Sequence, residues 1–246
     1  MSISLSLRHF EREFESATGT VQALEDVSFH VAPGDCIALV GPSGCGKSTI
    51  LRAIAGLDSN YSGEVQANEV AVREPDLSRG ILFQEPRLFP WLTVNENISF
   101  GLRLPRQECL RRAHELIDLV GLGGFEHAYP HQLSGGMAQR VAIARALAPN
   151  PAALLLDEPF GALDAFTRIR LQNALENIWL ARKMTMILVT HDIDEAIALG
   201  QRVVILTARP GRVSRILDID LPYPRDRGSE RFAHYRRELL IAFDLS

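Results

Sequence analysis

The chain has 246 residues, 46% of them hydrophobic and 23% charged, and this composition excludes disordered, collagen-like and disulfide-scaffold proteins. A globular chain of this length buries roughly 70% of its unfolded surface, and the net charge of −4 gives no broad positive field for nucleic acid or an anionic membrane. We find no apolar run of the roughly 20 residues that a membrane span needs, no N-terminal export pattern, and no CxxC pair among the cysteines, which suits a reducing cytoplasm.

Two kinds of strand pattern follow each other along the chain. Apolar and polar residues alternate around Ile3, Leu5 and Leu7, and again around Val27 and Phe29, which predicts antiparallel strands with one buried face. Continuous apolar runs come next, and these are typical of strands buried on both faces of a parallel sheet. The runs cover residues 36–40, 152–156, 184–189 and 203–206.

Helices are predicted between these runs, at residues 48–57, 107–120, 136–147 and 164–182. The order of strands and helices predicts an α/β fold with a mostly parallel core sheet and an antiparallel β subdomain. Residues 85–150 are mostly helical, and we expect them to form a helical subdomain inserted into a single domain of residues 1–246. The segment 210–246 is expected to form a short C-terminal tail, too small for an independent domain.

A glycine-rich segment, GPSGCGKST, directly follows a predicted strand and directly precedes a predicted helix. It matches the pattern GxxxxGK[ST], in which backbone amides wrap phosphates, the lysine reaches the β- and γ-phosphates and the serine ligates Mg²⁺. An ordinary glycine turn does not account for this strand-loop-helix context. The predicted nucleotide-binding residues of this phosphate loop are Gly41, Pro42, Ser43, Gly44, Cys45, Gly46, Lys47, Ser48 and Thr49.

Two other buried strands are followed by ionisable residues, Asp157 and Glu158 after one strand and His191 after the other. Ligands of α/β sheets bind at the carboxyl ends of strands, so we expect Asp157 to hold Mg²⁺ and Glu158 to act as general base. His191 is expected to hydrogen-bond the γ-phosphate. Alone, the acidic pair could be a solvated turn and the histidine a structural residue, but the glycine-rich loop favours the catalytic interpretation.

A second helix start in this sequence is also suited to binding an anion. Ser134, Gly135 and Gly136, in the sequence LSGGMAQR, open the helix predicted at 136–147. A serine that merely caps the helix is the simpler alternative. The chain therefore carries two phosphate-binding ends, which either lie close together in one chain or meet across a two-fold dimer.

The order of GPSGCGKST, Gln84, LSGGMAQR, LLLDEP, GALD and His191 resembles the nucleotide-binding subunit of an ABC transporter over nearly the whole chain. The resemblance implies a P-loop NTPase fold and a head-to-tail dimer that sandwiches two ATP molecules. In that arrangement each ATP lies between one chain's phosphate loop and the partner's Ser134 to Gly136. Asp164 belongs to the loop that joins the two sites.

The resemblance also implies roles for residues outside these motifs. It gives Gln84 a place in catalysis and among the Mg²⁺ ligands, and it places Phe14 against adenine, although Phe14 could instead be a core residue. Met137 stands where the family most often has glutamine, and we expect this departure to leave hydrolysis intact. Phe89, Trp91 and Leu92 fill the core of the helical subdomain or, as the resemblance implies, help to form the groove for a cytoplasmic helix of a permease.

Three segments, 88–102, 157–168 and 206–213, resemble the nitrate, sulfonate and taurine importer branch of that family. This implies a Mg²⁺-dependent ATPase that drives uptake of a small anion or related nutrient, peripheral to the cytoplasmic face of the bacterial inner membrane. The implied partners are a second copy of the chain, integral membrane permease subunits and, indirectly, an external substrate-binding protein; no nucleic acid is expected. Arginine-rich runs at 103–112 and 225–237 are expected to be solvated helix faces rather than membrane contacts.

Two other functions remain open from the sequence. A soluble ABC-type ATPase acting on nucleic acid or ribosomes usually carries coiled-coil insertions or paired nucleotide modules, which this sequence lacks. A subunit that binds nucleotide without hydrolysing it is disfavoured by Glu158 and His191.

Overall fold

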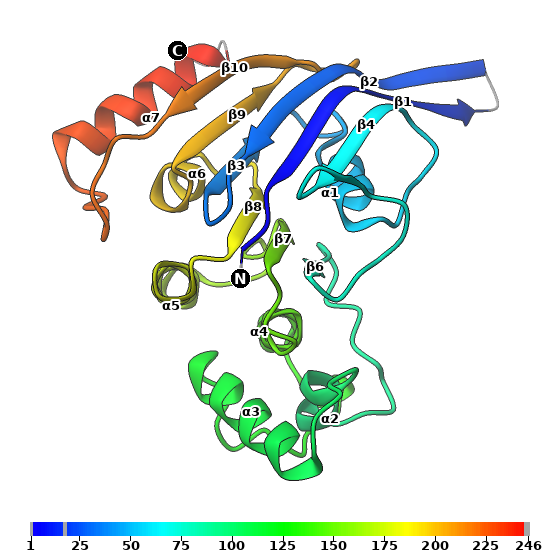
Figure 1. Ribbon diagram of the computed structural model, residues 1–246. Helices are drawn as coiled ribbons and strands as arrows, with labels where there is room; N and C mark the ends of the chain where they lie inside the picture. Colours follow the sequence, from blue (N-terminus) through cyan, green and yellow to red (C-terminus); the bar gives the residue numbers. More distant parts are fainter. Residues whose placement is uncertain (1, 17–18, 244–246) are drawn as a thin grey trace.

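A computed structural model describes residues 2–16 and 19–243, which form two sheets with helices packed around them (Figure 1). The smaller sheet is antiparallel, with strand order β2-β1-β4-β5. In it Leu5 pairs with Val31 and Leu7 with Phe29, and these four side chains are buried. The alternating pattern near the N-terminus therefore predicts the buried face correctly. The strands of this sheet are β1 (Leu5–Ser16), β2 (Gly19–Val31), β4 (Ser62–Ala67) and β5 (Val70–Ala71).

The larger sheet has strand order β10-β9-β3-β8-β7-β6 and is parallel except for β10, so the predicted α/β fold with a mostly parallel core is confirmed. Every residue of β3, β7 and β8 is buried, which explains the continuous apolar runs. The strands are β3 (Cys36–Val40), β6 (Arg79–Leu82), β7 (Ala153–Asp157), β8 (Thr185–Val189), β9 (Arg202–Leu206) and β10 (Val213–Asp218).

The two faces of this sheet belong to two different hydrophobic cores. Ile37 and Leu39 of β3 pack toward α1 (Lys47–Ala55) and the antiparallel sheet. Ala38 and Val40 pack into the opposite core, which includes α5 (Ala165–Arg182) and α6 (Ile193–Leu199). The carboxyl ends of β3, β7 and β8 are thereby held in a layer between two packed faces, and the candidate site forms at these ends.

The segment between β6 and β7 is helical, as predicted from the sequence. Figure 1 shows α4 (Gly135–Leu147) between the main sheet and the pair α2 (Val94–Ser99) and α3 (Arg106–Leu119). A short 3₁₀ turn, Pro130–Gln132, precedes α4. Phe89 contacts Trp91 and Phe100, but Trp91 is 69% exposed and does not fill the core of this subdomain.

The segment after residue 210, for which we expected a short tail, carries two elements. Strand β10 pairs antiparallel with β9 and extends the main sheet. Helix α7 (Glu230–Ala242) inserts Phe232 and Leu239, both fully buried, into the same core as α5 and α6. The prediction of a solvated arginine face is wrong for Arg225, which is buried and donates to backbone carbonyls of residues 197, 200, 219 and 221.

Within the described ranges, 2–16 and 19–243, no helix has both the length and the apolarity to cross a bilayer.

Candidate functional site

A cavity of about 550 Å³ lies where the phosphate loop, the antiparallel sheet and the end of β7 meet. The loop and the first turn of α1 form one wall, β1 and β2 form another, and Gln84 and Glu158 close a third. Nine of the lining residues are ones predicted from the sequence, and three were not. The lining residues are Phe14, Val21, Ala23, Ser43, Gly44, Gly46, Lys47, Ser48, Thr49, Gln84, Glu158 and Arg209.

Glycine is required at two positions of the phosphate loop. Gly44 and Gly46 have φ angles of +77° and +101°, which L side chains rarely adopt. A Cβ on Gly46 would also lie 2.6 Å from the side chain of Leu24. Gly46 is the N-cap of α1, and no side chain caps this helix. The first-turn amides of α1 are therefore available to an anion in the cavity, where the helix dipole favours negative charge.

Lys47 is almost fully buried and forms part of the loop's own bonding. Its Nζ donates to the carbonyl oxygens of Gly41, at 2.8 Å, and Pro42, at 2.9 Å. These bonds hold the ammonium group inside the curve of the loop, within the lining of the cavity. Gly41 and Pro42 are not among the residues that line the cavity, and the side chain of Cys45 is buried in the core.

Asp157, the last residue of β7, lies behind the loop and accepts a hydrogen bond of 2.9 Å from the Ser48 hydroxyl. Burial raises the pKa of this carboxyl, and the bond from Ser48 acts against that rise. A hydroxyl and a carboxylate side by side are oxygen ligands of the kind Mg²⁺ takes beside substrate phosphates. The Ser48 hydroxyl and the Asp157 carboxylate therefore fit Mg²⁺, whose charge one carboxylate and the phosphates of a nucleotide would balance.

Glu158 turns its side chain back over the cavity. Its φ of +47° lies in the left-handed region, which costs a non-glycine residue about 1 kcal/mol, while its amide still donates to Val189 of β8. One carboxylate oxygen accepts from Gln84 Nε2 at 3.0 Å, and the other lies 3.4 Å from His191 Nδ1. Three residues far apart in the sequence thus meet at one carboxylate, while His191 lines a small adjoining cavity with Glu158.

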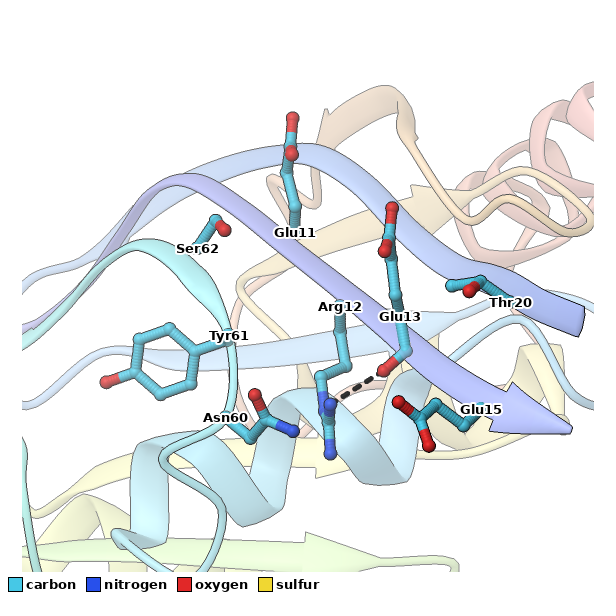
Figure 2. A pocket seen from close by; sticks show the side chains of 8 residues that line it. All are labelled: Glu11, Arg12, Glu13, Glu15, Thr20, Asn60, Tyr61 and Ser62. Atoms are coloured by element: carbon cyan, nitrogen blue, oxygen red, sulfur yellow. Dashed lines mark hydrogen bonds between the residues drawn. The ribbon is translucent and has the colours of Figure 1, made fainter.

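Phe14 lines the cavity, and its ring also contacts Arg12. The Cζ atom of Arg12 lies 4.3 Å from the ring centroid, and Arg12 Nε donates to Asp58 at 3.0 Å. Arg12 lines a separate cavity of about 370 Å³, shown in Figure 2, where it also bonds to the carbonyl of Glu13. The Phe14 ring therefore contacts a guanidinium that belongs to a different cavity, and it is itself part of the lining of the phosphate-loop cavity.

Ser134, Gly135 and Gly136 lie at the start of α4 and do not line the cavity of the phosphate loop. The Ser134 hydroxyl caps the helix by accepting from Met137 N at 3.2 Å. Gly135 has open space where a side chain would be, whereas Gly136 packs against Leu163. Asp164 caps α5 by accepting from two backbone amides. One chain therefore holds the two predicted phosphate-binding ends apart.

Comparison with known proteins agrees with this geometry. The sequence profile of the family described as "ABC transporter" matches residues 24–161. The chain belongs to the ABC transporter family. It is 50% identical over 242 residues to the aliphatic sulfonates import ATP-binding protein SsuB of Bacillus cereus, covering 98% of this chain and 96% of that protein. It is 44% identical over 237 residues to the nitrate import ATP-binding protein NrtD of Synechocystis, covering 95% and 89%.

Solved ABC cassettes share the fold. The dimeric structure of MJ0796, described as a bacterial ABC transporter cassette, superimposes with a TM-score of 0.81 at 33% identity and covers 87% of this chain and 98% of that one. A second structure of the same cassette, a dimer in a post-hydrolysis state bound to ADP and Pi, gives a TM-score of 0.80 at 32% identity over the same shares of the two chains. The predictions of an ABC ATPase fold and of a dimeric family are confirmed.

Sequence reasoning missed Val21, Ala23 and Arg209 in the wall of this ABC cassette's cavity. Val21 and Ala23, both in β2, have no polar group that would indicate a binding role. Only the neighbouring residue Phe14 could have indicated that they lie in the site. Arg209 lies in the segment 206–213, whose sequence resembles one importer branch without indicating a role in the site.

Proposed function

We propose that this chain is the ATP-hydrolysing subunit of an ABC importer that takes up a small organic or inorganic anion such as a sulfonate or nitrate. The observation that carries the proposal is that Lys47, Ser48 and Glu158 line one cavity at the ends of β3 and β7, with Asp157 bonded to Ser48 behind the loop. The names of the relatives, sulfonate and nitrate import proteins, support the class of cargo.

Different residues of the site bind the adenine, the phosphates and the Mg²⁺ of the nucleotide. Phe14 stacks on adenine, the loop amides and Lys47 bind the phosphates, and the Lys47 charge stabilises the γ-phosphate. Ser48, Asp157 and Gln84 hold Mg²⁺, which when bound neutralises phosphate charge. These contacts bind and orient the triphosphate while leaving its terminal phosphorus open to attack.

Glu158 acts as the general base for hydrolysis. Its carboxylate takes a proton from the water that attacks the γ-phosphate, and Gln84 holds the same carboxylate through the 3.0 Å bond. His191, 3.4 Å from the other carboxylate oxygen, donates to the γ-phosphate and steadies the charge that develops there. The left-handed turn at Glu158 aims the carboxylate toward these partners rather than along the strand.

Two copies of the chain close over the nucleotides, with Ser134, Gly135 and Gly136 of each copy covering the ATP of the other. This accounts for an anion-binding helix start that lies outside its own chain's cavity. The exposed Trp91, in the segment that begins at Gln84, contacts a cytoplasmic helix of a membrane permease. The subunit accordingly acts at the cytoplasmic face of the membrane, with an external binding protein delivering the cargo.

The variant Glu158→Gln tests this function. We expect it to bind ATP normally and to hydrolyse ATP about 10²-fold more slowly or worse, because the amide cannot accept the proton from water. Phosphate release and ATP retention are measured on the complex with its permease. The matched control is Glu108→Gln, at an exposed position in the first turn of α3.

Near-normal turnover in Glu158→Gln removes Glu158 from its role. Association of the purified chain with nucleic acid or ribosomes, sensitive to nuclease, would favour the soluble ATPase over the importer. Co-purification with membrane subunits supports the importer.

A further inference from the structure

The loop that joins β9 to β10 is braced by its own backbone and by Thr207. Thr207 N donates to the carbonyl of Arg212 at 2.9 Å, and the Thr207 hydroxyl donates to the carbonyl of Pro210 at 2.9 Å. The same hydroxyl accepts from Arg212 N at 3.0 Å. A loop with three such bonds across six residues holds a defined shape, so the residue at its tip, Arg209, is presented from a fixed support.

The loop is also fastened to the walls of the nucleotide cavity. Gly211 N donates to Ala23 O at 2.9 Å, and Gly211 O accepts from Glu25 N at 3.0 Å, which ties the loop to β2. A Cβ on Gly211 would lie 2.1 Å from the carbonyl oxygen of Cys45, so the backbones of this loop and the phosphate loop are in direct contact. Glycine at 211 is what permits that approach.

This support places the Arg209 guanidinium beside the phosphate loop. Its Nη2 atom donates to the carbonyl of Gly44 at 3.2 Å, and Arg209 lines the same cavity as Phe14 and Lys47. A guanidinium has five N–H donors, and the Gly44 bond uses one of them. No carboxylate pairs with Arg209 in residues 2–16 and 19–243, whereas the neighbouring Arg212 is paired with Glu25 at 2.6 Å.

Lys47 and Arg209 are the cationic side chains among the residues that line the cavity. The ammonium of Lys47 is bonded to the inner carbonyls of the loop, so it acts at the centre of the curve. Arg209 supplies positive charge from the outer side, over Gly44, with planar donors that match phosphate oxygens.

We infer that Arg209 is a nucleotide-binding residue whose guanidinium contacts the phosphates of ATP and ADP at the edge of the phosphate-loop cavity. The inference rests on the proposed function, since it takes the cavity to be the ATP site. It assigns a role to the 206–213 segment, which the steps of hydrolysis leave unused.

The test is the affinity of purified chain for ADP, which is not consumed, measured by calorimetry at low salt. We expect Arg209→Gln to raise the Kd for ADP about tenfold, in line with the loss of a charge-assisted phosphate contact. Arg209→Lys keeps a positive charge without the planar donors, so its Kd for ADP is expected to lie between that of wild type and that of Arg209→Gln. The difference between wild type and Arg209→Gln shrinks as salt is added.

The matched control is Arg215→Gln. Arg215 lies on β10, six residues further along, near Glu238 and outside the cavity. We expect its Kd for ADP to equal that of wild type. A Kd for Arg209→Gln within twofold of wild type at low salt overturns the inference, and so does an equal effect of Arg215→Gln.

Lys47→Ala separates this inference from the proposed function. If Lys47→Ala loses ADP binding and Arg209→Gln keeps it, only the role of Arg209 fails. If both variants bind ADP as wild type does, the cavity is not the nucleotide site and the proposed function fails as well. Thermal unfolding of each variant is followed in parallel, and if Arg209→Gln does not fold, an Arg209→Lys variant with wild-type affinity overturns the inference.

Discussion

Glu195 is a buried carboxylate that fixes the residues on both sides of His191. Its Oε2 atom accepts from the Thr190 hydroxyl at 2.6 Å, and its Oε1 atom accepts from Gln172 Nε2 at 3.0 Å. The Thr190 hydroxyl in turn accepts from Asp192 N at 3.0 Å. Burial raises the pKa of Glu195, although the bond from Thr190 acts against the rise. His191 is thus presented from a turn that a single carboxylate holds.

We predict that the stability deficit of Glu195→Gln shrinks as pH rises. A carboxyl whose folded-state pKa is raised stabilises the protein fully below its unfolded pKa, near 4.5, and loses that contribution as pH rises through the folded value. Glutamine does not titrate, so the free energy of unfolding of the variant moves toward that of wild type from pH 5 to pH 8. Urea unfolding of both proteins at the two pH values measures this.

The control for this prediction is Glu108→Gln, whose side chain lies exposed on α3. We expect its effect on the free energy of unfolding to be small and nearly the same at both pH values. A Glu195→Gln deficit that widens with pH would mean that the ionised carboxylate stabilises the fold, through Arg168 at 3.8 Å.

At the scale of secondary-structure elements, Arg145 joins α4 to the loop that begins at Gln84. Its Nη1 donates to the carbonyl of Arg87 at 2.9 Å and its Nη2 to that of Pro86 at 2.8 Å. Its Cζ also lies 5.6 Å from the ring centroid of Phe89. Burial lowers the pKa of this guanidinium. The helix that begins at Ser134 and the loop beside Glu158 are therefore tied by one side chain.

Arg145→Met is expected to lower the free energy of unfolding by about 1–3 kcal/mol, because two hydrogen bonds from a charged donor to backbone carbonyls of the loop are lost. Amide hydrogen exchange in residues 84–92 should become faster as the loop is released from α4. Arg103→Met, at an exposed arginine before α3, is the control and should change neither quantity. Unchanged exchange in the loop would contradict the link between these elements.

The elements that the sequence predicts well are those with a strong local signal. The buried strands and α1, α4 and α5 begin and end within two residues of their expected bounds, because apolar runs and caps such as Asp164 are local. Helix α6 and strand β10 were not predicted, since both are short. A helix face was expected at 225–237, but the burial of α7 was not, since α7 mixes arginines with its two buried side chains.

The residues of the candidate site likewise fall into those that a local motif identifies and those that it does not. The glycine-rich loop, Asp157, Glu158 and His191 could be found because each lies at a strand end with a recognisable motif. Arg12, Arg145 and Arg209 act through contacts with residues 46, 58 and 165 positions away along the chain, and no periodicity or motif marks such contacts. The contacts of these three arginines can be identified only from the tertiary structure.

At the scale of the whole molecule, the start of α4 can be altered without disturbing its own chain. A Cβ added at Gly135 would have no atom within 4 Å, and an acid in the first turn favours the helix dipole. We predict that Gly135→Asp leaves the thermal stability of the monomer unchanged. In the Glu158→Gln background, ATP-dependent dimerisation should be lost, because the carboxylate would face the partner's bound phosphates.

Sedimentation of the purified chains with and without ATP and Mg²⁺ measures this dimerisation. Gln107→Asp places the same acid in the first turn of α3 and should leave the dimer intact. A Gly135→Asp chain that still dimerises with ATP would place the start of α4 outside the dimer contact.

The packing of α7 into the main core affects how the nascent chain folds during synthesis. Phe232 and Leu239 are fully buried in the core that includes α6, the helix that α7 contacts, and α6 is synthesised before them. A nascent chain that has completed β9 still lacks β10 and these two side chains, so the face they cover stays open to water. The apolar surface that faces α7 is therefore exposed to ribosome-associated chaperones until α7 emerges, and we expect a chain truncated before residue 232 to aggregate.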